Sequence, residues 1–265
     1  MAAKFLMCSP EHYEEALPLC QRTLARVSVN GTLARAQWQI LYKVLTDQIG
    51  AEVELIEPVR GLPNMVFAAH AGIVSGKTFI RSNYRVKERQ PEGAFFEKWF
   101  EEHGYSVATI AKGFIFDGEG DMIPHARQLF YGYHSKSELH MPELVSAKME
   151  LGPASLQLID DRFHHLDTCL AVLNPDTILY YRDAFSEGAN QILRDTVKNC
   201  IVLRRDEALA WACNSIVIDK RIIISNECHL SAEMLRLLGY RVYRVDISEF
   251  RKACISVKSL VLRIA

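Results

Sequence analysis

The 265-residue sequence has no long apolar run, no closely spaced pair of cysteines and almost no net charge. Without about 18 consecutive apolar residues it predicts no membrane-spanning helix, and the few apolar residues before Cys8 are too short for a signal peptide. A formal net charge of -1 gives no reason to expect a nucleic-acid-binding surface. We therefore expect a cytoplasmic protein that binds neither membranes nor nucleic acid.

The seven cysteines are scattered and form no C-x-x-C pair, so the signatures of zinc ribbons and redox dithiols are missing. Most of them lie in apolar runs, which predicts buried thiols in a reducing compartment. Cys228 and His229 are adjacent, but no further ligands follow at metal spacing, so we predict no metal site there. With 49% hydrophobic and 24% charged residues, the chain can form a core without metals or disulfides.

What the sequence does contain is an internal repeat, in which an amphipathic helix ends near a glycine and an alternating strand follows. Glycine after the last helical turn supplies a left-handed cap, and asparagine is its usual substitute. The five predicted cap positions are Gly50, Gly104, Gly152, Asn199 and Gly239. They are 54, 48, 47 and 40 residues apart, and repeats of this size indicate propellers, arrays or solenoids.

Most repeats open with a predicted β-hairpin. β-Branched runs flank turn residues in three places, which are 65–68 with 78–80, 170–173 with 177–181, and 216–218 with 221–224. The opening strand Lys4–Met7 lacks such a partner, and the final strand Ser259–Ile264 could pair with it to close a ring. We predict an α/β fold of five ββαβ modules forming one domain over residues 1–265, because removing a module would expose unpaired strand edges.

Four short motifs then resemble those of the amidinotransferase-like penteins, a superfamily of guanidine-modifying enzymes. They are Pro63–Gly72 (family pattern P-D-x-V-F-x-x-N-x-G), Phe116–Asp121 (F-E-G-x-G-D), His165–Thr168 (H-L-D-T) and Glu249–Leu260 (E-F-x-K-x-G-G-x-V-K-C-L). The resemblance covers nearly the whole chain and is nearest to arginine dihydrolases and dimethylarginine dimethylaminohydrolase-like proteins. It implies the pentein fold, a five-bladed α/β propeller around a pseudo-five-fold axis. It also implies a small arginine-like guanidino compound as partner, with no metal or organic cofactor; a homo-oligomer or a subunit of a larger assembly stays open.

The resemblance also implies a chemistry. Carboxylates hold the planar guanidinium, a cysteine attacks its carbon, and a histidine shuttles protons. On this basis His165 is the expected acid/base, Ser259 stands at the nucleophile position, and Asp117 replaces a glutamate that contacts substrate or orients the histidine. The expected substrate-binding residues are Asn64, Phe67, His70, Asp121 and Asp167.

Several positions depart from the family pattern. Ser259 replaces the catalytic cysteine, and a hydroxyl that stays protonated at neutral pH is a far weaker nucleophile than a thiolate. The other departures are Asn64 for aspartate, His70 for asparagine, and Cys254 and Ile255 for two glycines. Two hypotheses follow. One is a guanidino C–N hydrolase or amidinotransferase that is impaired in the family chemistry. The other is a catalytically inactive pentein that serves as a ligand-binding or structural subunit.

Each motif also has a purely structural interpretation. His165 with Asp167 is consistent with a polar corner at a strand start, and residues 117–121 with a solvated turn. Ser75–Thr78 resembles the end of a phosphate-binding loop, but Ala71 stands where that loop needs glycine, which favours a hairpin turn. Two sets of apolar residues at helical spacing are expected to be core, namely Phe95, Phe96, Trp99 and Phe100, and Trp38, Leu41 and Leu45.

Overall fold

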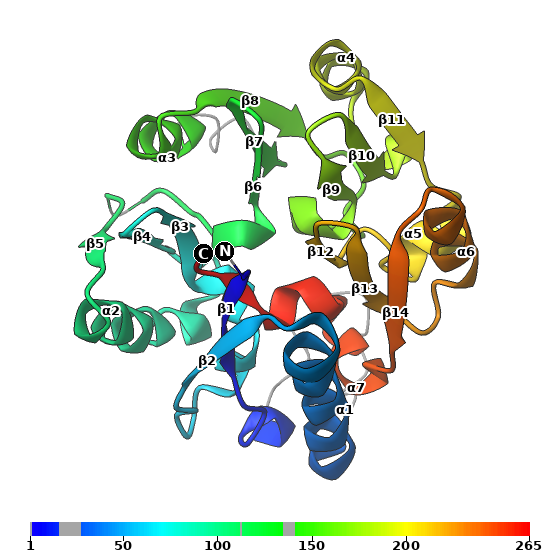
Figure 1. The fold of residues 1–265 in the computed structure, drawn as a ribbon. Coiled ribbons are helices and arrows are strands. Elements are labelled where there is room, and N and C mark those ends of the chain that lie inside the picture. The colour runs from blue at the N-terminus through cyan, green and yellow to red at the C-terminus, as the bar shows by residue number, and fades with distance from the viewer. Residues whose placement is uncertain (1, 16–27, 112, 135–140) are drawn as a thin grey trace.

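The computed structural model describes residues 2–15, 28–111, 113–134 and 141–265. In these residues five three-stranded sheets are arranged in a ring, with the longer helices at its periphery (Figure 1). In every sheet the middle strand pairs antiparallel with the inner strand and parallel with the outer strand. The predicted ring of five ββαβ modules is confirmed.

The first three blades are built as follows. The first contains β15 (Leu262–Arg263), β1 (Lys4–Cys8), α1 (Gly31–Lys43), a π-helical turn (Val44–Ile49) and β2 (Glu52–Ile56). The second contains β3 (Gly72–Ser75), β4 (Thr78–Arg81), α2 (Glu92–Glu102) and β5 (Ser106–Ala108). The third contains β6 (Met122–His125), β7 (Gln128–Tyr133), α3 (Met141–Met149) and β8 (Gly152–Gln157).

The other two blades follow the same order. The fourth contains β9 (Leu170–Asn174), β10 (Thr177–Tyr180), α4 (Glu187–Thr196) and β11 (Asn199–Val202). The fifth contains β12 (Ile216–Ile218), β13 (Arg221–Ser225), α6 (His229–Leu237) and β14 (Arg241–Val245). Two short helices lie outside this pattern, α5 (Arg205–Leu209) and α7 (Ser248–Arg251).

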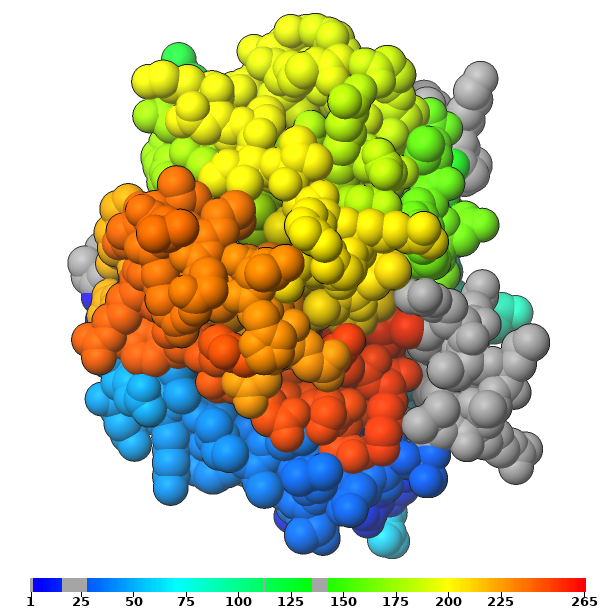
Figure 2. Space-filling view, turned by 90° about the vertical axis from the view of Figure 1, so that its right-hand side faces the viewer, coloured from blue at the N-terminus to red at the C-terminus, as the bar shows by residue number. Residues whose placement is uncertain are grey.

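The first blade closes the ring by joining the two ends of the chain. Phe5 and Leu6 of β1 pair with Arg263 and Leu262 of β15, as the sequence predicted. Figure 2 shows that the two halves of the chain also adjoin at the surface, where orange to red residues of the C-terminal part lie against blue residues of the N-terminal part. The predicted final strand is shorter than expected, because Ser259 belongs to a 3-10 turn, Val257–Leu260, that precedes β15.

Three of the five predicted helix caps are correct. Gly50, Gly104 and Gly239 have φ values of 75°, 74° and 82° and end their helices in the left-handed conformation. The other two predictions are wrong, because both residues begin strands. In the third blade Glu150 takes the left-handed position with a φ of 57°, and Gly152 starts β8. In the fourth blade Asn199 pairs with Thr177 in the β10–β11 ladder.

Two of the three predicted hairpins are correct, and one is displaced. Residues 65–68 are not a strand but belong to two 3-10 turns, Pro63–Val66 and Ala68–Ala71, and the strand starts only at Gly72. The apolar residues of this segment are all buried instead of alternating, and such a run does not distinguish a strand from a helical turn.

The hydrophobic core lies in clusters between neighbouring blades. Trp38, Leu41 and Leu45 are buried as predicted, and so are Phe96, Trp99 and Phe100, whereas Phe95 is exposed. Cys8, Cys169, Cys213 and Cys228 are buried free thiols. No helix among the described residues is long and apolar enough to cross a membrane.

A short turn precedes the inner strand of each blade. Four of these turns are 3-10 helices, at Ala68–Ala71, Gly118–Gly120, Leu166–Thr168 and Val257–Leu260, and the turn of the fifth blade occupies residues 210–213. The four 3-10 turns pack against one another, so residues far apart in the sequence meet near the axis of the ring. Each of the four motifs that carry the family resemblance contains one of these 3-10 turns.

Candidate active site

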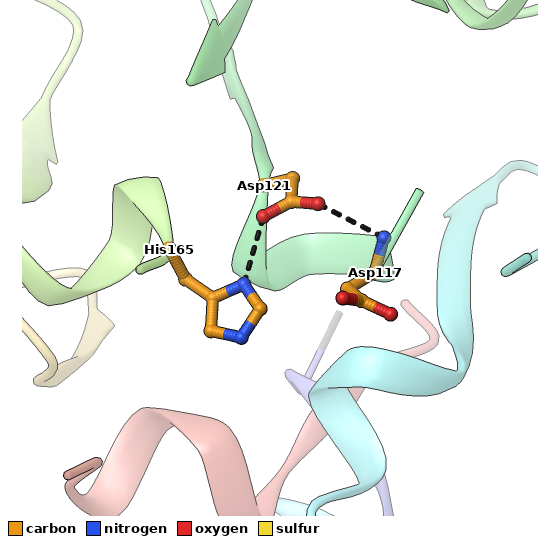
Figure 3. A group of neighbouring side chains, drawn as sticks. All are labelled: Asp117, Asp121 and His165. Atoms are coloured by element: carbon orange, nitrogen blue, oxygen red, sulfur yellow. Dashed lines mark hydrogen bonds and ion pairs between the residues drawn. The ribbon is translucent and has the colours of Figure 1, made fainter. Parts of the chain in front are cut away.

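Asp117, Asp121 and His165 form a hydrogen-bonded group near the axis (Figure 3). One oxygen of Asp121 accepts from His165 Nδ1 at 2.8 Å, and the other accepts from the backbone N–H of Asp117 at 3.0 Å. The Asp117 carboxylate lies beside the imidazole ring, and one side-chain atom of each residue falls within 4.8 Å of the others. Both oxygens of Asp121 are already used, which favours an acid–base group over a metal centre.

Two glycines allow the turn between Asp117 and Asp121 to approach its neighbours. Gly118 has a φ of 58°, and a Cβ atom there would lie 2.5 Å from the carbonyl oxygen of Ala69. A Cβ at Gly120 would lie 3.0 Å from His70 Cδ2 and 3.3 Å from His165 Nδ1. Glycine at these two positions therefore lets the turn pack directly against both histidine rings.

The electrostatics of this group favour a protonated His165. Burial by itself lowers the pKa of His165, but the Asp121 carboxylate, helped by Asp117, outweighs burial and raises it to about 9. Burial raises the pKa of Asp117 to about 6, and the neighbouring charge of Asp121 adds to this. At neutral pH the group therefore contains an imidazolium beside a carboxylate that titrates close to neutrality.

His70 lies against His165, with ring centroids 4.5 Å apart, and is tied to a buried ion pair. Arg89 Nη1 is 3.0 Å from His70 Nδ1, Arg89 Nη2 donates to the backbone carbonyl of Asn64 at 3.1 Å, and Glu92 accepts from the same guanidinium at 2.8 to 3.1 Å. Arg89 and Glu92 are almost inaccessible to solvent. Burial lowers the pKa of His70 well below its usual value, and nearby His165 adds to the effect, so His70 is neutral.

A cavity of about 430 Å³, which we call the histidine cavity, lies over these residues. Four of the predicted site residues line it: Phe67, His70, Asp117 and His165. The lining also contains Cys254 and Ile255, which the sequence analysis named as replacements of two glycines, and residues that it missed, which are Arg85, Val86, Arg89, His134, Asp161, His164, Thr168 and Ala253. Arg85 and Arg89 follow a β-hairpin closely in the sequence, and this was the available signal for a basic group at the site. Their spacing does not show which way the loop after the hairpin folds.

The other predicted residues lie elsewhere around the axis. Asn64 and Asp121 are buried and support their neighbours through the hydrogen bonds described above. Asp167 lines a second cavity of about 510 Å³, together with Glu119 and Lys258. Asp167 is buried, and burial raises its pKa to about 7 although Lys258, His165 and a contact with the Asn214 side chain oppose this.

Ser259 is fully buried and does not line either cavity. Its hydroxyl donates to Asn214 Oδ1 at 3.3 Å, and the same oxygen accepts from the backbone N–H groups of Ser256 at 2.8 Å and Ser259 at 3.3 Å. Asn214, which the sequence analysis also missed, thus holds the whole turn.

Cys254, at one of the family's glycine positions, has a φ of 60°, a conformation in which a side chain is strained. Ile255 is not in this conformation.

Comparison with known proteins shows which family the chain belongs to. No family model matches the chain. The chain is 30% identical to the dimethylarginine dimethylaminohydrolase of Mycobacterium tuberculosis over 261 residues, which is 98% of this chain and 85% of that protein. It superposes on the N-terminal domain of the arginine dihydrolase ArgZ bound to substrate with a TM-score of 0.94 at 32% identity, covering 99% of this chain and 98% of that one.

The chain belongs to the pentein superfamily.

Among other penteins, the chain is 34% identical to the bifunctional arginine dihydrolase/ornithine cyclodeaminase AgrE of Nostoc over 98% of its own length. It spans only 38% of AgrE and 37% of the full-length ArgZ of Synechocystis. A more distant pentein structure, a dimethylarginine dimethylaminohydrolase adduct at 20% identity, shares the fold with a TM-score of 0.84. The predicted pentein fold is therefore confirmed.

Proposed function

We propose that this pentein binds an arginine-like compound in the histidine cavity and lacks the thiol-dependent C–N bond cleavage of its family. By arginine-like we mean an amino acid whose side chain ends in a planar guanidino or ureido group. One observation carries the proposal. Asp117 and His165 line the cavity, whereas the Ser259 hydroxyl is buried outside its lining and bonded to Asn214.

The relatives support the choice of ligand. A mutant of AgrE has been crystallised with L-arginine, and the Mycobacterium relative is a dimethylarginine dimethylaminohydrolase. In this pentein Asp117 is suited to accept N–H groups of a planar ligand, and Phe67 offers an apolar wall. We assign proton transfer to His165, orientation of its ring to Asp121, and support of Arg89 to Asn64. Asp167 lies on the second cavity, so we give it a supporting electrostatic role.

The loss of cleavage follows from the chemistry of position 259. Attack on a guanidinium carbon needs a strong nucleophile, and a serine hydroxyl becomes one only when a base accepts its proton. The Ser259 hydroxyl instead donates to an amide oxygen, which is not a base, and the burial of Ser259 is complete. A working guanidino hydrolase, the other hypothesis from the sequence, would need a different nucleophile.

The remaining expectations about the whole protein stay part of the proposal. Pairing of β1 with β15 supports residues 1–265 as a single domain, because the first blade exists only when both ends come together. We also retain a cytoplasmic location, and assembly with other copies or subunits as an open alternative.

The experiment combines binding with product analysis. Isothermal titration with L-arginine, a methylated arginine and L-citrulline tests the ligand class, and assays of ammonia, citrulline and ornithine test cleavage. We expect binding of at least one compound and turnover far below about 1 per second, a low value for an enzyme. Since position 259 lies outside the lining of the cavity, Ser259→Cys should release no more ammonia than Ser256→Cys, the matched control that places a thiol on an equally buried serine of the same segment.

Two results would contradict the proposal. Turnover of about 1 per second or more by the unmodified chain would show that a nucleophile other than a thiol works here. Failure of every arginine-like compound to bind would show that the proposed ligand class is wrong.

A further inference from the structure

The contact between Arg89 and His70 determines which nitrogen of His70 carries its proton. A guanidinium has five N–H donors and no acceptor, so His70 Nδ1, 3.0 Å from Arg89 Nη1, must be the acceptor. His70 is 3% exposed and neutral, and its single proton therefore resides on Nε2. In this chain position 70 presents a hydrogen-bond donor and no free acceptor.

That donor is unused within the protein. His70 Nε2 is buried and has no hydrogen-bond partner among the described residues, although His70 lines the histidine cavity. A buried donor without a partner costs about 1–3 kcal/mol, which a ligand with an acceptor in the right place would recover. Gly120 packs against this ring, because a Cβ there would lie only 3.1 Å from Nε2, so any side chain at position 120 would crowd the donor.

A second donor stands beside the first. His165 donates from Nδ1 to Asp121, and its protonated ring also carries a proton on Nε2, on the side away from Asp121 (Figure 3). The two rings lie side by side, with centroids 4.5 Å apart, and both residues line the histidine cavity. The Asp117 carboxylate lines the same cavity and has an oxygen within 4.8 Å of a His165 ring nitrogen. The cavity therefore offers donors and an acceptor next to each other.

A guanidinium and a ureido group have the same planar shape but meet this arrangement differently. The guanidinium has only donors, so it would face the two histidine donors with N–H groups and place its positive charge beside an imidazolium and near Arg89. The ureido group is neutral, and its carbonyl oxygen accepts hydrogen bonds while its N–H groups donate.

We propose that the histidine cavity selects a ureido amino acid over a guanidino amino acid of the same shape, with His70 as the specificity-determining residue. The ureido oxygen accepts from the Nε2–H groups of His70 and His165, and a ureido N–H donates to Asp117. This inference rests on the proposed function, because it assumes that the cavity binds arginine-like compounds.

Isothermal titration of the unmodified protein with L-citrulline and L-arginine, at one pH and one ionic strength, tests the inference directly. One unpaired buried donor corresponds to a factor of about 10 or more, so we expect L-citrulline to bind at least about 10-fold more tightly. His70→Asn, which restores an acceptor at this position, should reduce the ratio of the two Kd values by about the same factor. His103→Asn, at the exposed residue that caps the C-terminus of α2, is the matched control and should leave the ratio unchanged.

The ratio of two affinities does not change through a general loss of stability, and the unmodified protein provides it even if the variant fails to fold. Tighter or equal binding of L-arginine by the unmodified protein would overturn the inference and leave the proposed function standing. Absence of binding by both compounds would overturn both.

Discussion

Two regions near the axis use buried polar groups in different ways. The acid–base side, Asp117, Asp121 and His165, is charged and borders the histidine cavity. The nucleophile side, Asn214 and Ser259, is neutral and closed, and its one amide oxygen accepts three hydrogen bonds from its own turn. Charged groups beside a cavity can respond to a ligand or to pH, whereas a neutral, internally bonded group mainly holds the backbone in place.

This difference suggests how the site has changed relative to the family pattern. Ser259 is part of the core, whereas Asp117 and His165 line the histidine cavity. The two regions therefore differ in what a substitution should do. On the acid–base side the effects should be large and dependent on pH, and on the nucleophile side small and independent of pH.

The largest loss of stability is expected at the buried ion pair of Arg89 and Glu92, which lies next to the acid–base side. Glu92→Gln leaves the Arg89 charge buried without a counter-ion, which should lower the free energy of unfolding by about 3–5 kcal/mol. Urea denaturation measures it. The matched control is Glu233→Gln, which breaks the exposed pair with Arg236 at the same i,i+3 spacing and should cost about 1 kcal/mol or less. Equal losses in the two variants would show that burial of this pair does not matter.

A smaller loss of stability, which depends on pH, is expected from Asp121→Asn. Because the folded pKa of His165 is raised, its contribution to stability is complete below the unfolded pKa of about 6.5 and is lost as pH rises towards about 9. Removing the carboxylate should return the pKa of His165 to about 6.5 or below, so the stability should no longer change between these two pH values. At pH 6 the free energy of unfolding should fall by about 1.5–3 kcal/mol.

Titration of the His165 ring resonances by NMR, with denaturation at pH 6 and 9.5, checks this prediction. Asp206→Asn, which removes an exposed carboxylate bonded to Arg204, is the control and should leave the His165 titration unchanged. A His165 pKa that stays near 9 in Asp121→Asn would mean that Asp117 alone protonates the ring.

The smallest loss of stability is expected from a substitution on the nucleophile side. Ser259→Ala removes one neutral hydrogen bond to Asn214, so it should cost about 1 kcal/mol, with the same value at pH 6 and pH 9. Denaturation at the two pH values measures it. A loss that grows with pH would place the Ser259 hydroxyl in electrostatic contact with His165 and weaken the contrast between the two regions.

Much of the fold was predictable because it depends on local patterns. Gly50, Gly104 and Gly239 end helices, the hairpins at 174–177 and 218–221 follow turn chemistry, and the leftover strands at the two chain ends pair. The predictions failed where pairing overrode a local preference, as at Asn199. They also failed where a buried apolar run had no periodicity, as at residues 65–68.

The amino-acid sequence alone determined the five-module ring, the family, and the presence of His165, Asp117 and Ser259 at the positions of the motifs. Only the tertiary structure decided that Arg89 holds His70 as a donor, that Asn214 binds the Ser259 hydroxyl, and that Asp167 lies on a different cavity from His165. The physical reason is that turns from separate blades meet at the axis, where a hydrogen-bond partner comes from another blade and has no fixed distance along the chain.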